Sequence, residues 1–207
     1  MDIAAVQRFA NADLTDEIKA LICQYGDHNE VLTFLLRMIW QGRLADALPE
    51  AKQYALKPVA GRYVRISAFR AALTVGNAAD ALEIRTAFVG EAKPLNRKWL
   101  AELIEGLPND QASVDWLLAA LEKSEQKQKY SSDGLTEAVS KYALAIQIEL
   151  LPRLIAGIAK LVAKRPVVQR RHCEISERHG WLLKCAAQAV QRLIEARHPF
   201  ALSLETI

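Results

Sequence analysis

The chain has 207 residues, of which 51% are hydrophobic and 25% charged, with a formal net charge of +3. This composition is that of a globular protein and excludes a disordered chain. The length suffices for one large domain or two small ones with a sizeable core. Only nine glycines and seven prolines occur, and helix-forming residues dominate, so the composition predicts an all-α fold.

The charge is unevenly distributed. Residues 160–207 carry nine Lys and Arg against four Asp and Glu, so the C-terminal quarter is the basic end. The three cysteines stand singly, and the N-terminus lacks the charged and apolar regions of a secretory signal, so we expect a reducing, cytoplasmic location. The most apolar stretch, 142–162, is interrupted by charged residues, and we expect no membrane span.

Helical periodicity and stop signals predict a series of short helices over residues 1–128. Short turns between helices of this length are typical of stacked antiparallel helical hairpins. The expected helices are one near 2–10, one from Thr15 to Gly26, one that Asp27 or Asn29 caps and Gly42 ends, two over 44–56 and 61–75, one capped by Asn77, one with Pro94 in its first turn and its end at Gly106, and one after a turn at 108–110.

After a loop at 129–134 the pattern changes to longer helices. Residues 135–164 carry a continuous apolar stripe, and Pro152 in its middle predicts a kink or a break. We expect a turn at Arg165-Pro166, and residues 167–197 should form one or two further helices. The segment 135–207 should pack on the same stack as the helices of 1–128.

The clearest motif lies in the predicted helix over 61–75. Val64-Arg65 with Ala68 three positions after the arginine resembles the second helix of HEAT repeats, although Ala72 stands where a leucine is usual. In such repeats the arginine bonds along the stack while the valine and alanine pack inside. The resemblance implies a HEAT-like α-solenoid. Small residues at Val64, Ala68, Ala72 and Val75 share one helix face and would let a neighbouring helix approach closely.

Two longer blocks show a second resemblance. Residues 36–47 through 63–71, and 179–184 through 192–199, are similar to the helical-repeat region of large bacterial STAND/NACHT-type ATPases. That region is a sensor or scaffold, in many cases in defence against phage. The phosphate-binding pattern Gly-x-x-x-x-Gly-Lys-Ser/Thr does not occur, so the ATPase module is absent from this chain. The resemblance implies a piece of such a protein or a stand-alone relative.

The main candidate site is a basic cluster near the C-terminus. As a phosphate-contacting surface it would bind nucleic acid with a strong dependence on salt. The preferred interpretation is a solvated helix end whose cations complement the helix dipole. Its residues are Lys160, Lys164, Arg165, Arg170, Arg171, His172 and Arg178.

Other candidates have structural interpretations. His172, Cys173, His179 and Cys185 lack the spacing of a zinc site, so we interpret them as surface histidines and core cysteines and expect no metal or cofactor. Four tryptophans fall in apolar helical patterns and are interpreted as core residues. The alternative for them is a base-stacking surface, as in helical-repeat DNA glycosylases, with Asp115 as the carboxylate. These tryptophans are Trp40, Trp99, Trp116 and Trp181.

Three arginines of the predicted helix over 61–75 are interpreted as interhelix pairing residues, with Asp46 or Glu50 on the preceding helix as possible partners. They are Arg62, Arg65 and Arg70.

The sequence therefore predicts a non-enzymatic helical-repeat scaffold or recognition segment. Its partner would be a macromolecule, a protein in the first place, and it could be the sensor part of a STAND-type defence ATPase. The competing hypothesis is a HEAT-like nucleic-acid-binding or nucleic-acid-modifying protein that uses the basic C-terminal helices. A regulatory oligomerisation segment is a third possibility.

Overall fold

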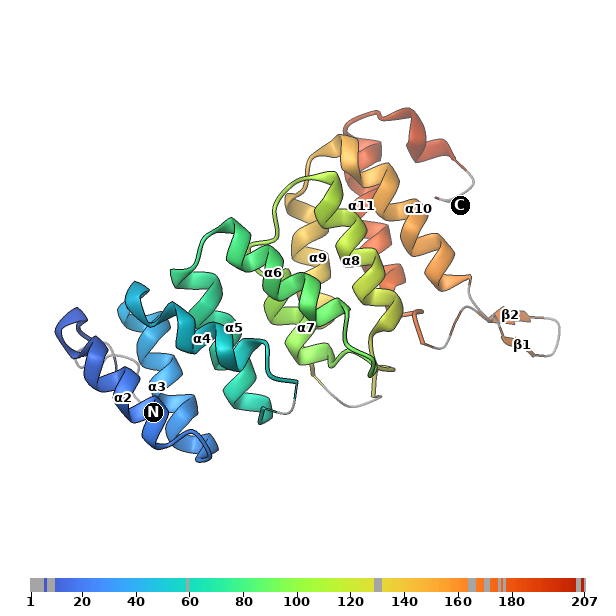
Figure 1. Cartoon of the computed structure of the whole chain (residues 1–207). Coiled ribbons are helices and arrows are strands. Elements are labelled where there is room, and N and C mark those ends of the chain that lie inside the picture. The colour runs from blue at the N-terminus through green and yellow to red at the C-terminus, as the bar shows by residue number, and fades with distance from the viewer. Residues whose placement is uncertain are drawn as a thin grey trace. The chain divides into compact units, whose positions relative to one another are not determined.

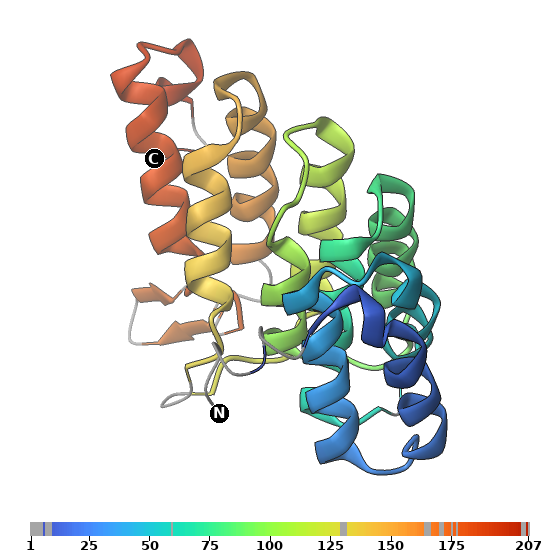
Figure 2. The same ribbon diagram turned by 90° about the vertical axis from the view of Figure 1, so that its left-hand side faces the viewer.

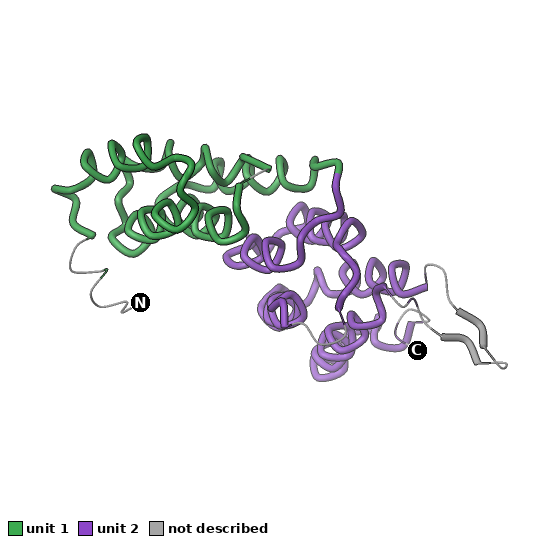
Figure 3. The backbone as a smooth tube through the Cα atoms, turned by 90° about the horizontal axis from the view of Figure 1, so that it is seen from below, with its two compact units in different colours: residues 1–92 green, residues 93–207 purple. Residues whose placement is uncertain are grey.

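The computed structural model describes residues 6, 10–58, 60–128, 132–163, 167–169, 172–174, 176, 178–203 and 206, with backbone alone in 167–169 and 172–174 (Figure 1). The chain forms two compact units, Met1–Ala92 and Lys93–Ile207, coloured separately in Figure 3. The division falls after Ala92 and not in the 129–134 loop.

All the secondary-structure elements of unit 1 in the described residues are helices. Its elements are η1 (Ala12–Leu14), α2 (Thr15–Gln24), α3 (Asn29–Gly42), η2 (Ala45–Ala47), α4 (Leu48–Ala55), α5 (Arg62–Val75) and α6 (Ala78–Val89), where η marks a 3₁₀ helix.

Helix α5 lies at the centre of unit 1, where it packs against α3, α4 and α6. Three members of its small-residue stripe, Val64, Ala68 and Ala72, are buried, while Val75 is partly exposed. The phenyl ring of Phe69 meets that of Phe88 on α6 edge to face, with ring centroids 5.8 Å apart. Burial of these side chains removes apolar surface from water and holds α5 against its neighbours.

The helix ends of unit 1 follow the sequence signals closely. Helix α3 ends at Gly42, and the left-handed residue that follows is Arg43, with φ of 51°. A Cβ at position 42 would lie 2.7 Å from the carbonyl oxygen of Ala10, so this glycine permits a close backbone approach. Asn77 caps α6, where its side chain and that of Asp80 form a reciprocal capping box.

Unit 2 contains the remaining helices and a short hairpin. Its elements are α7 (Arg97–Ile104), α8 (Gln111–Lys123), α9 (Leu135–Ala145), η3 (Ile148–Leu150), α10 (Leu151–Val162), β1 (Val167–Gln169), β2 (His172–Glu174), α11 (Leu182–Glu195) and η4 (Pro199–Leu202).

The helices of unit 2 pack on their second neighbours along the chain. Helix α9 lies between α7 and α11, while α8 packs against α10, as Figures 1 and 2 show. Helix α11 also contacts α10. Gly157 of α10 faces Leu118 of α8, because a Cβ at position 157 would lie 2.3 Å from the Cδ1 atom of that leucine.

Three details of unit 2 differ from the prediction or decide between alternatives. Pro152 breaks the long apolar stripe into α9 and α10 and lies in the first turn of α10, where it costs no hydrogen bond. Helix α7 is capped by Asn96, so Pro94 precedes the helix instead of lying in its first turn. Residues expected to begin a helix at 167 form the antiparallel pair β1–β2, with Val168 opposite Cys173.

The all-α class is confirmed for the described part of the chain, apart from this hairpin. None of the described helices is both long enough and apolar enough to cross a bilayer. The predicted helix near 2–10 (apart from residues 6 and 10), the turn at Arg165-Pro166 and residues 129–131 of the 129–134 loop fall outside the described residues.

Candidate functional site

The structure places only part of the basic cluster predicted near the C-terminus. Lys164, Arg165, Arg170 and Arg171 lie outside the described residues, as does the side chain of His172 on β2. The side chains of two members, Lys160 and Arg178, are described, and their surroundings differ. Lys160 is exposed in the last turn of α10, whereas Arg178 donates hydrogen bonds from Nε and Nη2 to the carbonyl oxygen of Ser124.

Arg178 therefore also has a structural role, because it satisfies the carbonyl group that follows α8.

The histidine and cysteine candidates separate into core positions and undescribed side chains. Cys185 is buried as expected, 3.3 Å from the hydroxyl of Ser140, and burial raises the pKa of its thiol. His179 is also buried, against the expectation of a surface residue, with Nε2 3.3 Å from the carbonyl oxygen of Leu121. Among the described residues, no group of three or more His, Cys, Asp and Glu side chains could hold a metal ion.

The tryptophans are half-buried instead of fully buried core residues. Two of them lie beneath arginines: the guanidinium of Arg70 is 5.9 Å from the Trp40 ring centroid, and that of Arg97 is 4.4 Å from the Trp181 ring centroid. Asp115, the carboxylate of the glycosylase alternative, forms an exposed two-point ion pair with Arg153 of α10. That carboxylate thus joins α8 to α10.

In unit 1 the arginine of the HEAT-like motif is a buried interhelix residue. Arg65 is 1% exposed, and its Nε donates to the carbonyl oxygen of Ala55 at the end of α4. Its Nη1 and Nη2 donate to the carboxylate of Glu91, which follows α6. The guanidinium lies 5.2 and 5.3 Å from the ring centroids of Phe69 and Phe88. The acidic partner is therefore Glu91, which the sequence analysis did not consider, and Arg65 joins α5 to both neighbouring segments.

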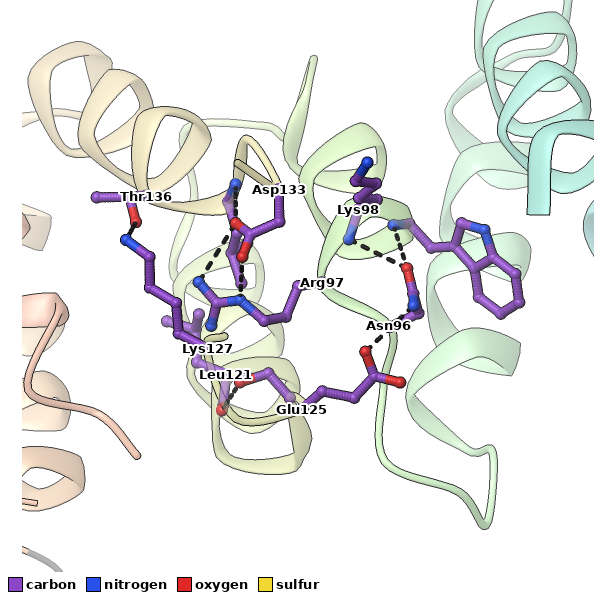
Figure 4. Close-up of polar contacts among 11 residues, drawn as sticks. Asn96, Arg97, Lys98, Leu121, Glu125, Lys127, Asp133 and Thr136 are labelled. Atoms are coloured by element: carbon purple, nitrogen blue, oxygen red, sulfur yellow. Dashed lines mark hydrogen bonds and ion pairs between the residues drawn. The ribbon is translucent and has the colours of Figure 1, made fainter. Parts of the chain in front are cut away.

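In unit 2 a second buried arginine has the same kind of role (Figure 4). Arg97, the first residue of α7, donates to Asp133 from Nε at 2.5 Å and from Nη2 at 3.3 Å. The Asp133 carboxylate also accepts the backbone N–H of Leu135 in the first turn of α9. Lys127 donates to the Thr136 hydroxyl beside it. This network attaches the segment between α8 and α9 to the start of α7.

The same segment is held on its other side by Asn96. The amide nitrogen of Asn96 donates to Glu125, and its oxygen accepts the backbone N–H groups of Lys98 and Trp99 (Figure 4). The backbone of Leu95 pairs with this segment through Lys123 and Glu125. The Arg97 and Asn96 networks thus position the segment between α8 and α9 against the start of α7.

Unit 1 contains a pocket of about 410 Å³ between the starts of two helices. The size falls within the range of ligand-binding pockets. Its lining comes from the first three turns of α3 and from the N-cap and first residues of α5. We call it the α3–α5 pocket, and its lining residues are Asn29, Glu30, Thr33, Arg37, Gly61, Arg62, Tyr63 and Val64.

Close packing of the two helix starts shapes this pocket. A Cβ at Gly61 would lie 2.8 Å from the Oδ1 atom of Asn29, so the absence of a side chain at position 61 lets α5 begin against α3. Val64 is buried, whereas Tyr63 remains 65% exposed. The pocket therefore has an apolar residue within it and an aromatic ring at an exposed position.

The start of α5 departs from the usual design of a helix N-terminus. Its N-cap is Gly61, which has no capping side chain, and the first turn contains no acidic residue. The first intrahelical hydrogen bond runs from the N–H of Arg65 to the carbonyl of Gly61, so the N–H groups of the three residues between have no acceptor within the helix. Arg62 at the first helical position adds a positive charge to the positive end of the dipole, an arrangement that costs about 0.3–1 kcal/mol. Local rules of this kind are often broken at functional sites.

The sequence analysis missed this pocket. It did not relate Asn29 to Gly61, which is 32 positions further along the chain. The available signal was the absence of a capping side chain or an acidic residue at the start of the best-defined helix. Comparison of the chain with protein-family models, with curated proteins and with solved structures finds no match.

Proposed function

We propose that the chain is a HEAT-like α-solenoid with a non-enzymatic role, a scaffold or recognition segment that binds a protein partner. The observation that carries this proposal is the packing of helices on their second neighbours, α3 on α5 in unit 1 and α7 on α9, α9 on α11 and α8 on α10 in unit 2. In an α-solenoid each helix packs on its counterpart in the next hairpin, which leaves a long surface for a partner.

The buried arginines support the same proposal. In HEAT repeats the arginine of the second helix bonds along the stack, and Arg65 joins α5 to the segments that flank it. Arg97 makes the corresponding type of connection in unit 2. With the two blocks similar to STAND/NACHT-type helical regions, this pattern supports a role as the sensor part of such an ATPase.

Nucleic-acid binding through the basic C-terminal end is the second candidate. Lys160 is exposed, and Arg178 is exposed as well although it bonds to Ser124. This candidate predicts binding to duplex DNA or RNA that weakens steeply with salt, because each phosphate contact releases counterions.

One experiment separates the two candidates. The full chain is used to select from a phage-displayed random dodecapeptide library, and it is titrated against duplex DNA and RNA at two salt concentrations. The proposal predicts enriched peptides that bind the isolated chain. No enrichment, together with a salt-sensitive nucleic-acid complex that is lost in the Arg170→Glu/Arg171→Glu variant, would overturn it in favour of the second candidate.

A further inference from the structure

We propose that the α3–α5 pocket binds a short acidic segment of a protein partner and holds one of its carboxylates beside Arg37 and Arg62. The inference rests on the proposed function in that the partner is a protein, and it adds the place and the chemistry of recognition.

Charge is the first argument. The pocket lining contains Arg37 and Arg62 and only one acidic residue, Glu30. The positive end of the α5 dipole opens at the same place, with neither an acidic residue in its first turn nor a capping side chain to offset it. A carboxylate from a partner would accept hydrogen bonds from guanidinium groups, and the positive end of the α5 dipole would stabilise its negative charge.

The apolar part of the lining is the second argument. Val64 is buried and Tyr63 is largely exposed. An aromatic ring with little to cover it is typical of the residues that dominate protein interfaces. An acidic residue with an adjacent aliphatic or aromatic residue would match this lining.

Glu30 and the size of the pocket favour a peptide over a polyanion. A volume of about 410 Å³ accommodates a few side chains. A nucleic-acid backbone would bring several phosphates toward the one carboxylate in the lining and would not enter a pocket of this size. A single carboxylate can lie on the arginine side and avoid Glu30.

The test uses fluorescein-labelled dodecapeptides taken from the library selection on the full chain. Each peptide is compared with a version in which every Asp and Glu is replaced by its amide, and binding is measured by fluorescence anisotropy. We expect the amide version to bind at least tenfold more weakly. Arg62→Glu should weaken the acidic peptide by a similar factor, since it reverses a charge in the lining, and Glu30→Gln should strengthen it about threefold.

Lys184→Glu is the matched control, because it makes the same change of charge at an exposed site on α11 in the other unit. It should alter the affinity less than twofold. Urea unfolding verifies that Arg62→Glu is folded, and the comparison of acidic and amide peptides tests the pocket in the unchanged chain.

The outcomes separate this inference from the proposed function. Peptides that bind the wild type and Arg62→Glu equally, or that lose as much affinity in Lys184→Glu as in Arg62→Glu, would overturn the pocket while leaving protein binding intact. Selected peptides without acidic residues would overturn it too. Failure to select any peptide would contradict the proposed function itself, and a salt-sensitive DNA or RNA complex lost in Arg62→Glu would replace the peptide with a polyanion.

Discussion

Asp133 accepts two hydrogen bonds from the guanidinium of Arg97, which lies 36 positions earlier in the chain. Both side chains are buried, with 4% of Arg97 and 7% of Asp133 exposed, and the Trp181 ring covers the guanidinium. One ion pair therefore joins the starts of α7 and α9 to the residue just before α11. A buried charge that loses its partner is costly, so this pair should be sensitive to single substitutions.

We expect Asp133→Asn to lower the free energy of unfolding by about 3 kcal/mol, because it leaves the Arg97 charge buried beside a neutral amide. Urea unfolding followed by circular dichroism measures the change. The double variant Arg97→Met/Asp133→Leu, which removes both charges, should lose less than Asp133→Asn alone. If the free energy of unfolding of Asp133→Asn lies within 0.5 kcal/mol of the wild-type value, the role assigned to the pair is contradicted.

The same carboxylate predicts a pH dependence. Burial alone would raise the pKa of Asp133, but hydrogen bonds from Arg97 and the Leu135 N–H, with the charges of Arg97 and Lys127, bring it below the usual value of 3.8. A pKa that is lower in the folded state stabilises the protein above the unfolded pKa, and this contribution is lost as pH falls through the folded pKa. The stability difference between wild type and Asp133→Asn should be constant from pH 7 to pH 5 and shrink below about pH 4. A difference that grows on acidification would contradict this.

Arg65 gives a prediction about geometry instead of charge. Arg65→Lys keeps the charge but removes the planar group that bonds Ala55 and Glu91 between two phenyl rings, so we expect a loss of about 2 kcal/mol. Arg153→Lys is the control, because Arg153 makes a similar two-point pair with Asp115 at an exposed position. The control should cost less than about 1 kcal/mol. Equal losses in urea unfolding would argue against a special role for Arg65.

Local signals predicted much of the fold. Helix α5 begins and ends as the sequence indicates, and Gly42 and Asn77 mark the ends and starts of helices as expected. Pro152 left a kink and a break as alternatives, and the structure has a break because proline is accommodated in a first turn. Each of these features depends on residues within a few positions of one another, which is the range that sequence patterns report.

Long-range partners were not predictable in the same way. Arg65 was correctly regarded as an interhelix residue, but its partner Glu91 lies 26 positions away on the far side of α6.

The pair β1–β2 was missed because Val167-Val168 was included in a helical pattern, although β-branched residues directly after a proline favour a strand. Most of the basic cluster lies outside the described residues, so its role stays a prediction.

The contact between α8 and α10 can be tested by the sign of one substitution. Gly157→Ala in an exposed helix would stabilise the protein by about 1 kcal/mol. Here the added methyl group would meet the side chain of Leu118, so we expect a loss of about 1–3 kcal/mol in urea unfolding. In the Leu118→Ala variant, which lacks that side chain, Gly157→Ala should lower the free energy of unfolding by less than it does in the wild type. A stabilised Gly157→Ala variant would contradict the close packing of α8 on α10.

Hydrogen–deuterium exchange shows directly whether a protein partner is recognised at the α3–α5 pocket. The full chain is labelled with and without a saturating library-selected acidic peptide. We expect slower exchange of the backbone amides of Arg62, Tyr63 and Val64 and of the first turns of α3, and unchanged exchange in α8 and α10. Protection confined to unit 2, with the amides at the start of α5 unaffected, would contradict it.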